Sequence, residues 1–237
     1  MKTSALHLIL FLLFTYSVLG QVDPKKAIDP AYGIQGYESM VASINGDSVR
    51  TCDGAPCSGY VEDFYTNGTL LHKGFYVNGQ LQSFKNYFPN GEMERKLGIV
   101  DENHCKLQVF YESGAKKSEV KYSYGNVKEW VDYYENGNVE YEEKFDKNFE
   151  FVIFRDSYYE NGNPQTTMKF ENKKDHTYFK KEYHEDGTMA AEGLIHFFAL
   201  IGDYRKIDEW KVYDKAGKHI KTEAYVNGKL NEVKAVD

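Results

Sequence analysis

The stretch Glu129–Asn148, EWVDYYENGNVEYEEKFDKN, has the sequence of one β-hairpin. Trp130, Tyr133 and Tyr134 favour a strand, because aromatic side chains fit the pleated surface of a sheet. Asn136-Gly137 then predicts a type I′ turn, in which both central residues have positive φ. After the turn, apolar and charged side chains alternate, as in a strand that buries one face. The stretch therefore predicts two strands joined by a tight turn.

Copies of this hairpin fill most of the chain, and their turn glycines mark the repeat. These glycines are Gly68, Gly91, Gly114, Gly137, Gly162, Gly187 and Gly217. They are separated by 23, 23, 23, 25, 25 and 30 residues, and an aromatic residue stands four positions before each of them. Self-similarity at such a period is the signature of a repeat architecture.

One such hairpin cannot bury its apolar face alone, so neighbouring hairpins must share edges and cover one another. We therefore expect an all-β fold, in which tandem β-hairpin repeats form an elongated, twisted antiparallel meander sheet. The repeat predicts a single domain from residue 48 to 237 with about seven units. Trp130 and Trp210 are expected in its core, and the charged residues 229–237 in a tail.

The unit W-x-x-Y-Y-x-N-G, followed by Y-x-N-G, resembles the MORN repeat. It is similar to the variant form found in bacterial proteins labelled the YwqK antitoxin family. Val61–Gly79, Glu129–Asn148 and Trp210–Gly228 fit best, whereas Arg155 and Lys180 depart from the pattern. The resemblance implies a scaffold, or a membrane- or protein-binding module, rather than an enzyme. The family name alone suggests an antitoxin- or immunity-like protein.

The N-terminus has the features of a signal peptide, Met1–Gly20. A basic residue, Lys2, precedes the apolar run Leu8–Phe14, and small residues follow it. The run is too short to span a bilayer, so we expect cleavage and export to the periplasm or medium; an uncleaved anchor is the alternative. Residues 21–47 are then a leader or linker, and no transmembrane span is expected in the mature chain.

The charge balance and the cysteines indicate which partners and which cysteine chemistry to expect. The chain has 29 basic and 36 acidic residues, which argues against nucleic acid as a partner. Cys52 and Cys57 bracket a turn, and an exported protein favours a disulfide between them. The alternative is a redox pair, which normally has two intervening residues rather than four. Cys105 is expected to be buried or lightly reactive.

Motifs for catalysis, for a cofactor or for a metal ion are absent from the sequence, so none of these is expected. The histidines lack a spacing such as H-x-x-x-H, and there is no nucleophile elbow or phosphate-binding glycine loop. A glycosidase-like pair of carboxylates, assembled only in the folded chain, stays an alternative.

Doubled aromatic residues before the turns are the main candidates for a binding surface. Adjacent residues in a strand point to opposite faces, so one aromatic of each pair is expected to leave the core and join a stripe. This candidate stripe consists of Tyr65, Phe88, Tyr111, Tyr134 and Tyr159. Core packing is the alternative role for these rings.

The apolar run Leu194–Ile201 is expected to be a strand that covers the core, or else a docking patch for a partner. Taken together, the sequence predicts an exported, non-enzymatic repeat protein that acts as a protein-binding scaffold. The alternative is a carbohydrate- or cell-envelope-binding module that uses the tyrosine stripe. The expected partner is therefore an unknown protein or an envelope glycan, and self-association through open sheet edges is a further possibility.

Overall fold

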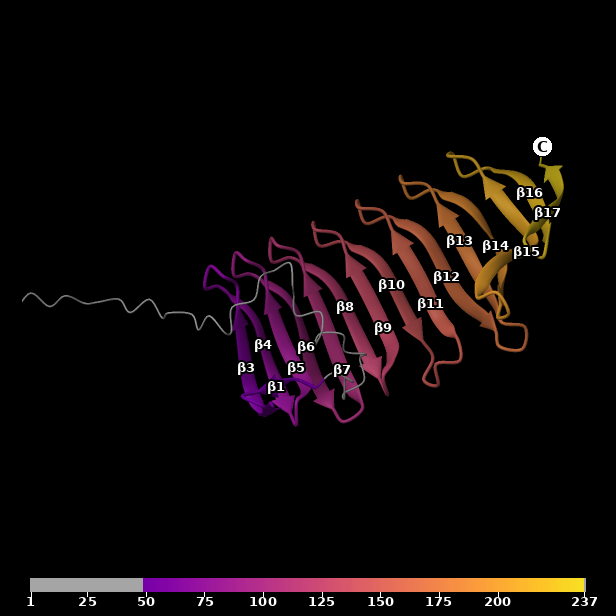
Figure 1. Cartoon of the computed structure of the whole chain (residues 1–237). Coiled ribbons are helices and arrows are strands. Elements are labelled where there is room, and N and C mark those ends of the chain that lie inside the picture. The colour runs from indigo at the N-terminus through magenta and orange to yellow at the C-terminus, as the bar shows by residue number, and fades with distance from the viewer. Residues whose placement is uncertain (1–48, 237) are drawn as a thin grey trace, which may run out of the picture.

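The computed structural model describes residues 49–236, which fold as an all-β structure without a helix. Fifteen of its strands, β3 to β17, form one antiparallel sheet in chain order, so each strand pairs with its neighbours in sequence. The sheet is open, with β3 at one edge and β17 at the other (Figure 1). This confirms the predicted meander of hairpin repeats. The predicted signal peptide and leader, residues 1–47, lie outside the described residues.

Seven hairpins and a last strand make up the sheet. The strands are β3 Gly59–Phe64, β4 Leu70–Val77, β5 Gln80–Tyr87, β6 Met93–Asp101, β7 His104–Phe110, β8 Lys116–Ser123, β9 Asn126–Tyr133, β10 Val139–Phe145, β11 Val152–Tyr158, β12 Pro164–Asn172, β13 Thr177–Tyr183, β14 Met189–Phe198, β15 Asp203–Tyr213, β16 His219–Val226 and β17 Lys229–Ala235. We use "first turns" for the connections within each hairpin, from β3–β4 to β15–β16, and "second turns" for those between hairpins.

The first turns do not have the predicted type I′ geometry. In the unit of Gly137, the Tyr134 N–H donates to the Asn138 carbonyl and the Gly137 N–H donates to the Tyr134 carbonyl, both at 2.9 Å. Gly137 has a φ of 91°, but Asn136 is not among the residues with positive φ. This is a three-residue loop, a type I turn followed by a left-handed glycine and a bulge. The prediction was wrong because Asn136 acts through its side chain, whose Oδ1 accepts the Asn138 N–H at 2.9 Å.

The type I′ geometry occurs instead in second turns. Asn78-Gly79, Tyr124-Gly125 and Asn227-Gly228 each have positive φ at two consecutive residues. Two such residues define a type I′ turn, whose twist matches that of the flanking strands. Other second turns are longer, such as the loop between Phe145 and Val152.

One face of the sheet carries two apolar clusters. The first includes Tyr76, Leu81, Phe84, Leu97 and Cys105, and the second includes Val152, Met168, Tyr178, Ile195 and Trp210. The cross-strand register puts these side chains on one face, because side chains alternate along each strand.

The two tryptophans differ in their burial. Trp210 is 0% exposed and lies over Gly193, where an added Cβ would come within 2.6 Å of the indole ring. Trp130 is 38% exposed, and Glu143 is its partner in the register. The expectation that both lie in the core is therefore right for Trp210 and wrong for Trp130. The difference arises because only Trp210 has a glycine to pack upon.

The predicted disulfide between Cys52 and Cys57 is present, and its loop covers one end of the first cluster. Its two short strands, β1 Thr51–Cys52 and β2 Ala55–Pro56, pair across this loop. The loop is joined to the β4–β5 turn, because the Gly79 N–H donates to the Cys57 carbonyl at 2.7 Å. Cys105 is buried in the same cluster, and burial raises the pKa of its thiol.

The C-terminal third contains two departures from expectation. Residues 229–235, predicted as a charged tail, form the exposed edge strand β17. The apolar run from Leu194 to Ile201 is divided: Ile195 is buried in the second cluster, whereas Leu200 and Ile201 are exposed in the β14–β15 turn. The predicted strand is right for the first half of the run, and the tip is open to solvent.

Candidate functional site: the first-turn edge

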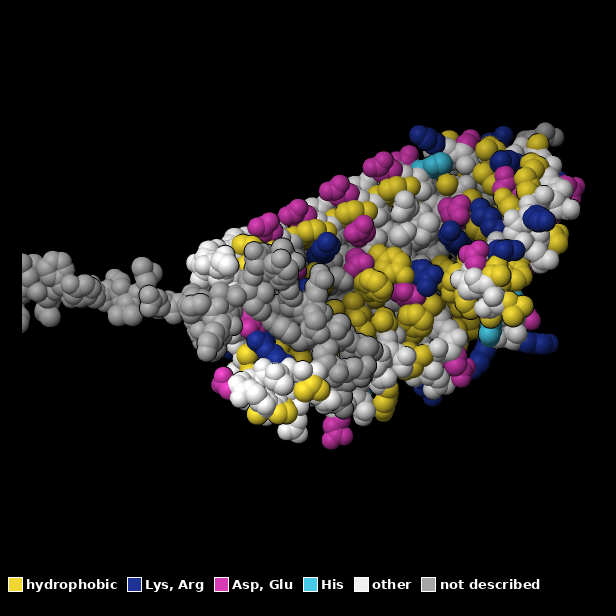
Figure 2. All heavy atoms as spheres, in the orientation of Figure 1, with side chains coloured by type: hydrophobic (Ala, Val, Ile, Leu, Met, Phe, Trp, Pro, Cys, Tyr) yellow, Lys and Arg dark blue, Asp and Glu magenta, His cyan; other side chains and the backbone are white. Residues whose placement is uncertain are grey.

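The first turns lie side by side at one end of the strands. We call this side of the sheet, which runs across the strands from β3 to β16, the first-turn edge. A meander places alternate turns on opposite edges, and the short turns follow one another along the upper edge in Figure 1. Acidic and hydrophobic side chains alternate along this edge in Figure 2. The acidic residues at the first loop position are exposed, and they are Glu112, Glu135, Glu160 and Glu185.

The candidate stripe residues lie on this edge, each at the start of a first turn. Four of them are tyrosines, and each donates its hydroxyl proton to a backbone carbonyl of the next unit. The acceptors are Tyr87, Tyr133, Tyr158 and Tyr183, at 2.7, 2.8, 2.8 and 2.9 Å from Tyr65, Tyr111, Tyr134 and Tyr159 respectively. Phe88 has the same place in its unit but lacks the hydroxyl.

These hydrogen bonds and the burial of the rings limit which atoms of the stripe a ligand could contact. Tyr65 is only 6% exposed, and the other four rings are partly buried. Burial raises the pKa of Tyr111 and Tyr134, and the nearby Glu140 carboxylate raises it further, so both hydroxyls keep their protons. Their hydrogen bonds serve the fold, and a ligand would contact ring edges rather than hydroxyl groups. A ligand-binding role for the stripe stays a prediction.

Asparagine side chains add a second set of bonds between neighbouring first turns. The Nδ2 groups of Asn136 and Asn138 donate to the Glu160 carbonyl at 2.9 and 2.8 Å. Asn161 and Asn163 donate in the same way to the Glu185 carbonyl, both at 2.9 Å. The turn at Gly137 is thus tied to the turn at Gly162, and that turn to the one at Gly187, which fixes the backbone of Glu160 and Glu185.

The linking role of these asparagines was not predicted from the sequence. A signal was present, because Asn-Gly-Asn occurs in two consecutive units, around Gly137 and Gly162. We assigned the first asparagine of each motif to backbone conformation alone. Its side chain in fact bonds both within its own turn and to the next one.

The arrangement produces a row of carboxylates at a regular spacing. Successive first turns are two strands apart, or about 9.6 Å for strands about 4.8 Å apart. Thr66, Pro89 and Lys215 occupy the equivalent position in the outer units, so the acidic row is confined to the four units between them. A fixed row of like charges attracts a surface of opposite charge and sets its register.

The buried carboxylates of β10 and β11 are engaged by neighbouring groups. Glu143 accepts hydrogen bonds from Arg155 at 2.6 Å and from the Tyr141 hydroxyl at 2.7 Å. Asp156 accepts the Met168 N–H at 3.0 Å. Within residues 49–236 no group of three His, Cys, Asp or Glu side chains is placed to hold a metal ion. Over the same residues, no helix is long and apolar enough to cross a membrane.

Comparison with known proteins supports the repeat. The MORN repeat variant family matches residues 58–78 and 127–147, two of the hairpin units. A search of curated proteins gives no match. Two solved structures of TarM have similarity to the chain, one of them the S. aureus protein in complex with fondaparinux, α-GlcNAc-glycerol and UDP. They share 9% and 10% identity with TM-scores of 0.20 and 0.19.

The similarity covers 62% of this chain but only 21% of each TarM chain. At these TM-scores it carries no argument about fold or function. The hairpin units at residues 58–78 and 127–147 are therefore similar to the MORN repeat variant, and the structure extends their pattern through the sheet.

Proposed function

We propose that this protein is an exported, non-enzymatic scaffold that holds a partner protein along its first-turn edge. The observation that carries the proposal is the constant geometry of this edge. All seven first turns have the same pair of backbone hydrogen bonds, and four consecutive turns carry an exposed glutamate at the same position. A repeated, rigid surface of this kind suits the binding of an extended partner.

Export is supported by the N-terminal sequence and by the disulfide. Met1–Gly20 has the three regions of a signal peptide. The bond between Cys52 and Cys57 is typical of proteins that fold in an oxidising compartment. The proposal of a non-enzymatic role is supported by the repeat, whose hairpins extend from residue 59 to 235.

The chemistry of the edge indicates a basic partner surface. Glu112, Glu135, Glu160 and Glu185 form no ion pair within the described residues, so their charges are available. Exposed charges act mainly on the rate of association and on orientation, and salt screens them. Binding should therefore weaken as ionic strength rises.

Affinity capture with matched charge variants tests this proposal. The bait is residues 21–237 immobilised against envelope and medium fractions of the source organism, and retained proteins are quantified. One variant combines Glu112→Lys, Glu135→Lys and Glu160→Lys on the first-turn edge. Its control combines Glu102→Lys, Glu150→Lys and Glu171→Lys near the second turns, which changes the net charge equally.

The proposal predicts a stoichiometric protein that the unchanged bait and the control retain and that the first-turn variant loses. A protein retained equally by both variants would contradict the assignment of the edge. Absence of any saturable protein partner would contradict the scaffold function itself.

A further inference from the structure

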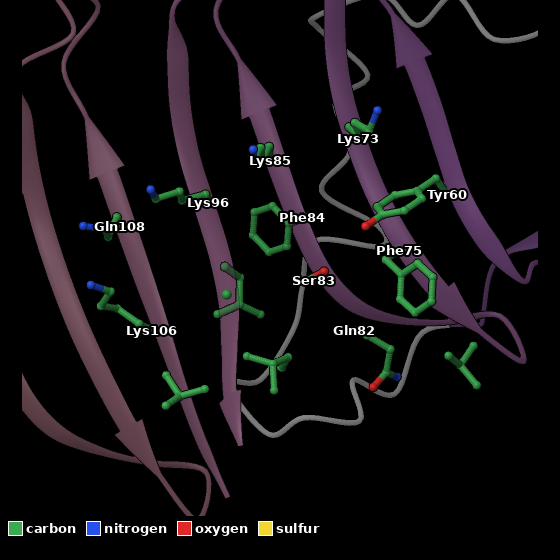
Figure 3. Close-up of a pocket in the computed structure, with 15 residues that line it drawn as sticks. Tyr60, Lys73, Phe75, Gln82, Ser83, Phe84, Lys85, Lys96, Lys106 and Gln108 are labelled. Carbon is green, nitrogen blue, oxygen red and sulfur yellow. The ribbon is translucent and has the colours of Figure 1, made fainter. Parts of the chain in front are cut away.

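A second surface lies on the opposite face from the two apolar clusters, near the N-terminal end of the sheet. Strands β3 to β7 form an open groove there of about 1060 Å³ (Figure 3). Its lining includes Tyr60 and Phe75 at one side, Ser83 and Gly98 between, and four lysines. The groove shares no residue with the first-turn edge, so a role for it does not depend on the proposed function.

The lysines form a row across the strands. Lys73 lies opposite Lys85, and Lys85 lies opposite Lys96, which gives one lysine on each of β4, β5 and β6. Figure 3 shows these side chains at a similar height, with Lys106 below them on β7. None of the described residues that line the groove is acidic, although the whole chain has a net charge of −7.

The four lysines that line the groove differ in their ion pairs. Lys73 pairs with Glu62 at 2.7 Å, and Lys106 lies 3.8 Å from Glu119. Lys85 and Lys96 form no ion pair within the described residues, and they face each other directly across neighbouring strands. Like charges in that arrangement destabilise a sheet. An anion bound between them would remove this repulsion.

The rest of the groove offers two aromatic rings, tilted by 60° to each other, and free space. Tyr60 is 72% exposed, and its ring centroid lies 5.1 Å from that of Phe75. At Gly98 an added Cβ would meet nothing within 4 Å, so packing does not require a glycine there. Ser83, Gln82 and Gln108 add hydrogen-bonding groups to the lining.

We infer that this groove binds a chain of acidic sugars that runs across β4, β5 and β6. Strands lie about 4.8 Å apart, which is close to the rise per ring of an extended pyranose chain. One carboxylate or acidic ester per sugar would then meet one lysine per strand. The C–H faces of a sugar stack on exposed aromatic rings, and the groove is large enough for several rings.

An acidic peptide fits the same charges less well. An extended peptide gains most of its affinity from backbone hydrogen bonds at an open strand edge. The strands that carry the lysine row are interior strands, and their backbone groups are already paired on both sides. A sugar chain needs only the side chains of the face.

Titration calorimetry with hexagalacturonate tests the inference, with cellohexaose as a neutral probe of the same length. The protein is residues 21–237, at low and physiological salt. We expect saturable binding of hexagalacturonate, no binding of cellohexaose, and an affinity that falls with salt. Lys85→Glu with Lys96→Glu should weaken binding at least tenfold. Lys169→Glu with Lys211→Glu, on the same face outside the groove, should change it less than twofold.

A variant that changes no charged residue tests the contribution of the groove's shape to binding. Gly98→Leu fills the open space, and we expect it to weaken hexagalacturonate binding at least fivefold without loss of the β-sheet circular dichroism signal. The inference would be overturned if hexagalacturonate showed no saturable binding, or if neither groove variant weakened its binding. Equal binding of hexaglutamate or of a single-stranded oligonucleotide would overturn the assignment to sugars.

Discussion

The first-turn edge and the second-turn edge both contain tight turns with glycine, but they differ in how much the length of their loops varies. The first-turn edge has the same three-residue loop in all seven units, with the same pair of backbone hydrogen bonds. The second-turn edge ranges from two residues at Asn78-Gly79 to six between Phe145 and Val152. The repeat spacing rises from 23 to 25 residues where second turns lengthen, and to 30 where β14 and β15 are themselves longer, with 10 and 11 residues.

The hydrogen bonds explain the difference. Tyrosine hydroxyls join consecutive units at the first turns, with donors Tyr111, Tyr134 and Tyr159 and acceptors in the following unit. A change of loop length there would break bonds in two units at once. The longest second turn, the loop around Asp146, satisfies its backbone within the loop. The two-residue second turns differ, because the Gly79 and Tyr124 N–H groups donate to the Cys57 and Asn103 carbonyls, which lie outside their own turns. The second-turn edge thus varies in length where a loop bonds to itself, whereas the first turns are joined to their neighbours by side chains.

Insertions should show the largest contrast between the edges. Adding Gly-Ser after Glu135 opens the first turn and separates Asn136 and Tyr134 from their partners, and it should lower the free energy of unfolding by about 3 kcal/mol, since each lost bond contributes about 1 kcal/mol. The same insertion after Lys174, in an exposed second turn, should lower it by less than about 1 kcal/mol. Urea unfolding measures both, and equal losses would contradict the comparison.

Removing the asparagine links tests the edge without changing its length. Asn136→Ala with Asn138→Ala deletes two donors to the Glu160 carbonyl and the cap within the turn. We expect a loss of about 2 kcal/mol in the free energy of unfolding. The control is Asn148→Ala in a second turn, which should change it by less than about 0.5 kcal/mol. If the double variant had an unchanged free energy of unfolding, the asparagine links would not contribute to stability.

The tyrosine links can be both removed and added. Tyr134→Phe deletes the bond to the Tyr158 carbonyl and should cost about 1 kcal/mol of stability. Phe88→Tyr places a hydroxyl where four other units have one, and should increase stability by up to about 1 kcal/mol. Tyr124→Phe, in a second turn where the residue is 69% exposed, is the control and should be neutral. Thermal unfolding of the three variants tests whether these hydroxyl bonds stabilise the fold. A lower melting temperature for Phe88→Tyr would contradict that role.

The smallest effect concerns pH. Hydrogen bonds from the Thr188 side chain and backbone hold the pKa of Asp186, in the sixth first turn, below its usual value of 3.8. A lowered folded-state pKa stabilises the fold above the unfolded-state value, and this stability is lost as pH falls through the folded-state value. Asp186→Asn keeps the acceptor oxygen but not the charge, so it should be slightly less stable near pH 7 and lose less stability on acidification. Identical pH profiles in urea unfolding would count against this bond.

Much of the fold followed from the sequence because the turn residues recur in every unit. The seven glycines located the first turns, and the alternation around Tyr141 indicated which face is buried. The turn type was wrong because Asn-Gly is compatible with both geometries, and the choice depends on where the Asn136 side chain finds its partner. Trp130 was misplaced because its burial depends on its cross-strand neighbour.

The two surfaces were harder to foresee. Lys73, Lys85 and Lys96 stand 12 and 11 residues apart, and only the register of three strands brings them together. The stripe residues were expected to leave the core, but they start the first turns, where Tyr65 is buried and the tyrosine hydroxyls bond to the following unit. Contacts between units depend on the twist and spacing of the sheet, which the sequence of one unit does not contain.

Native-state hydrogen exchange tests most directly the central claim that the first turns are held by their neighbours and the long second turns are not. The amide groups to compare are those of Tyr134 and Gly137 in a first turn and of Phe149 and Ile201 in second turns. We predict markedly slower exchange for the first pair, with an opening free energy that falls in the Asn136→Ala, Asn138→Ala variant. Equal exchange on the two edges, or an unchanged rate in that variant, would contradict the claim.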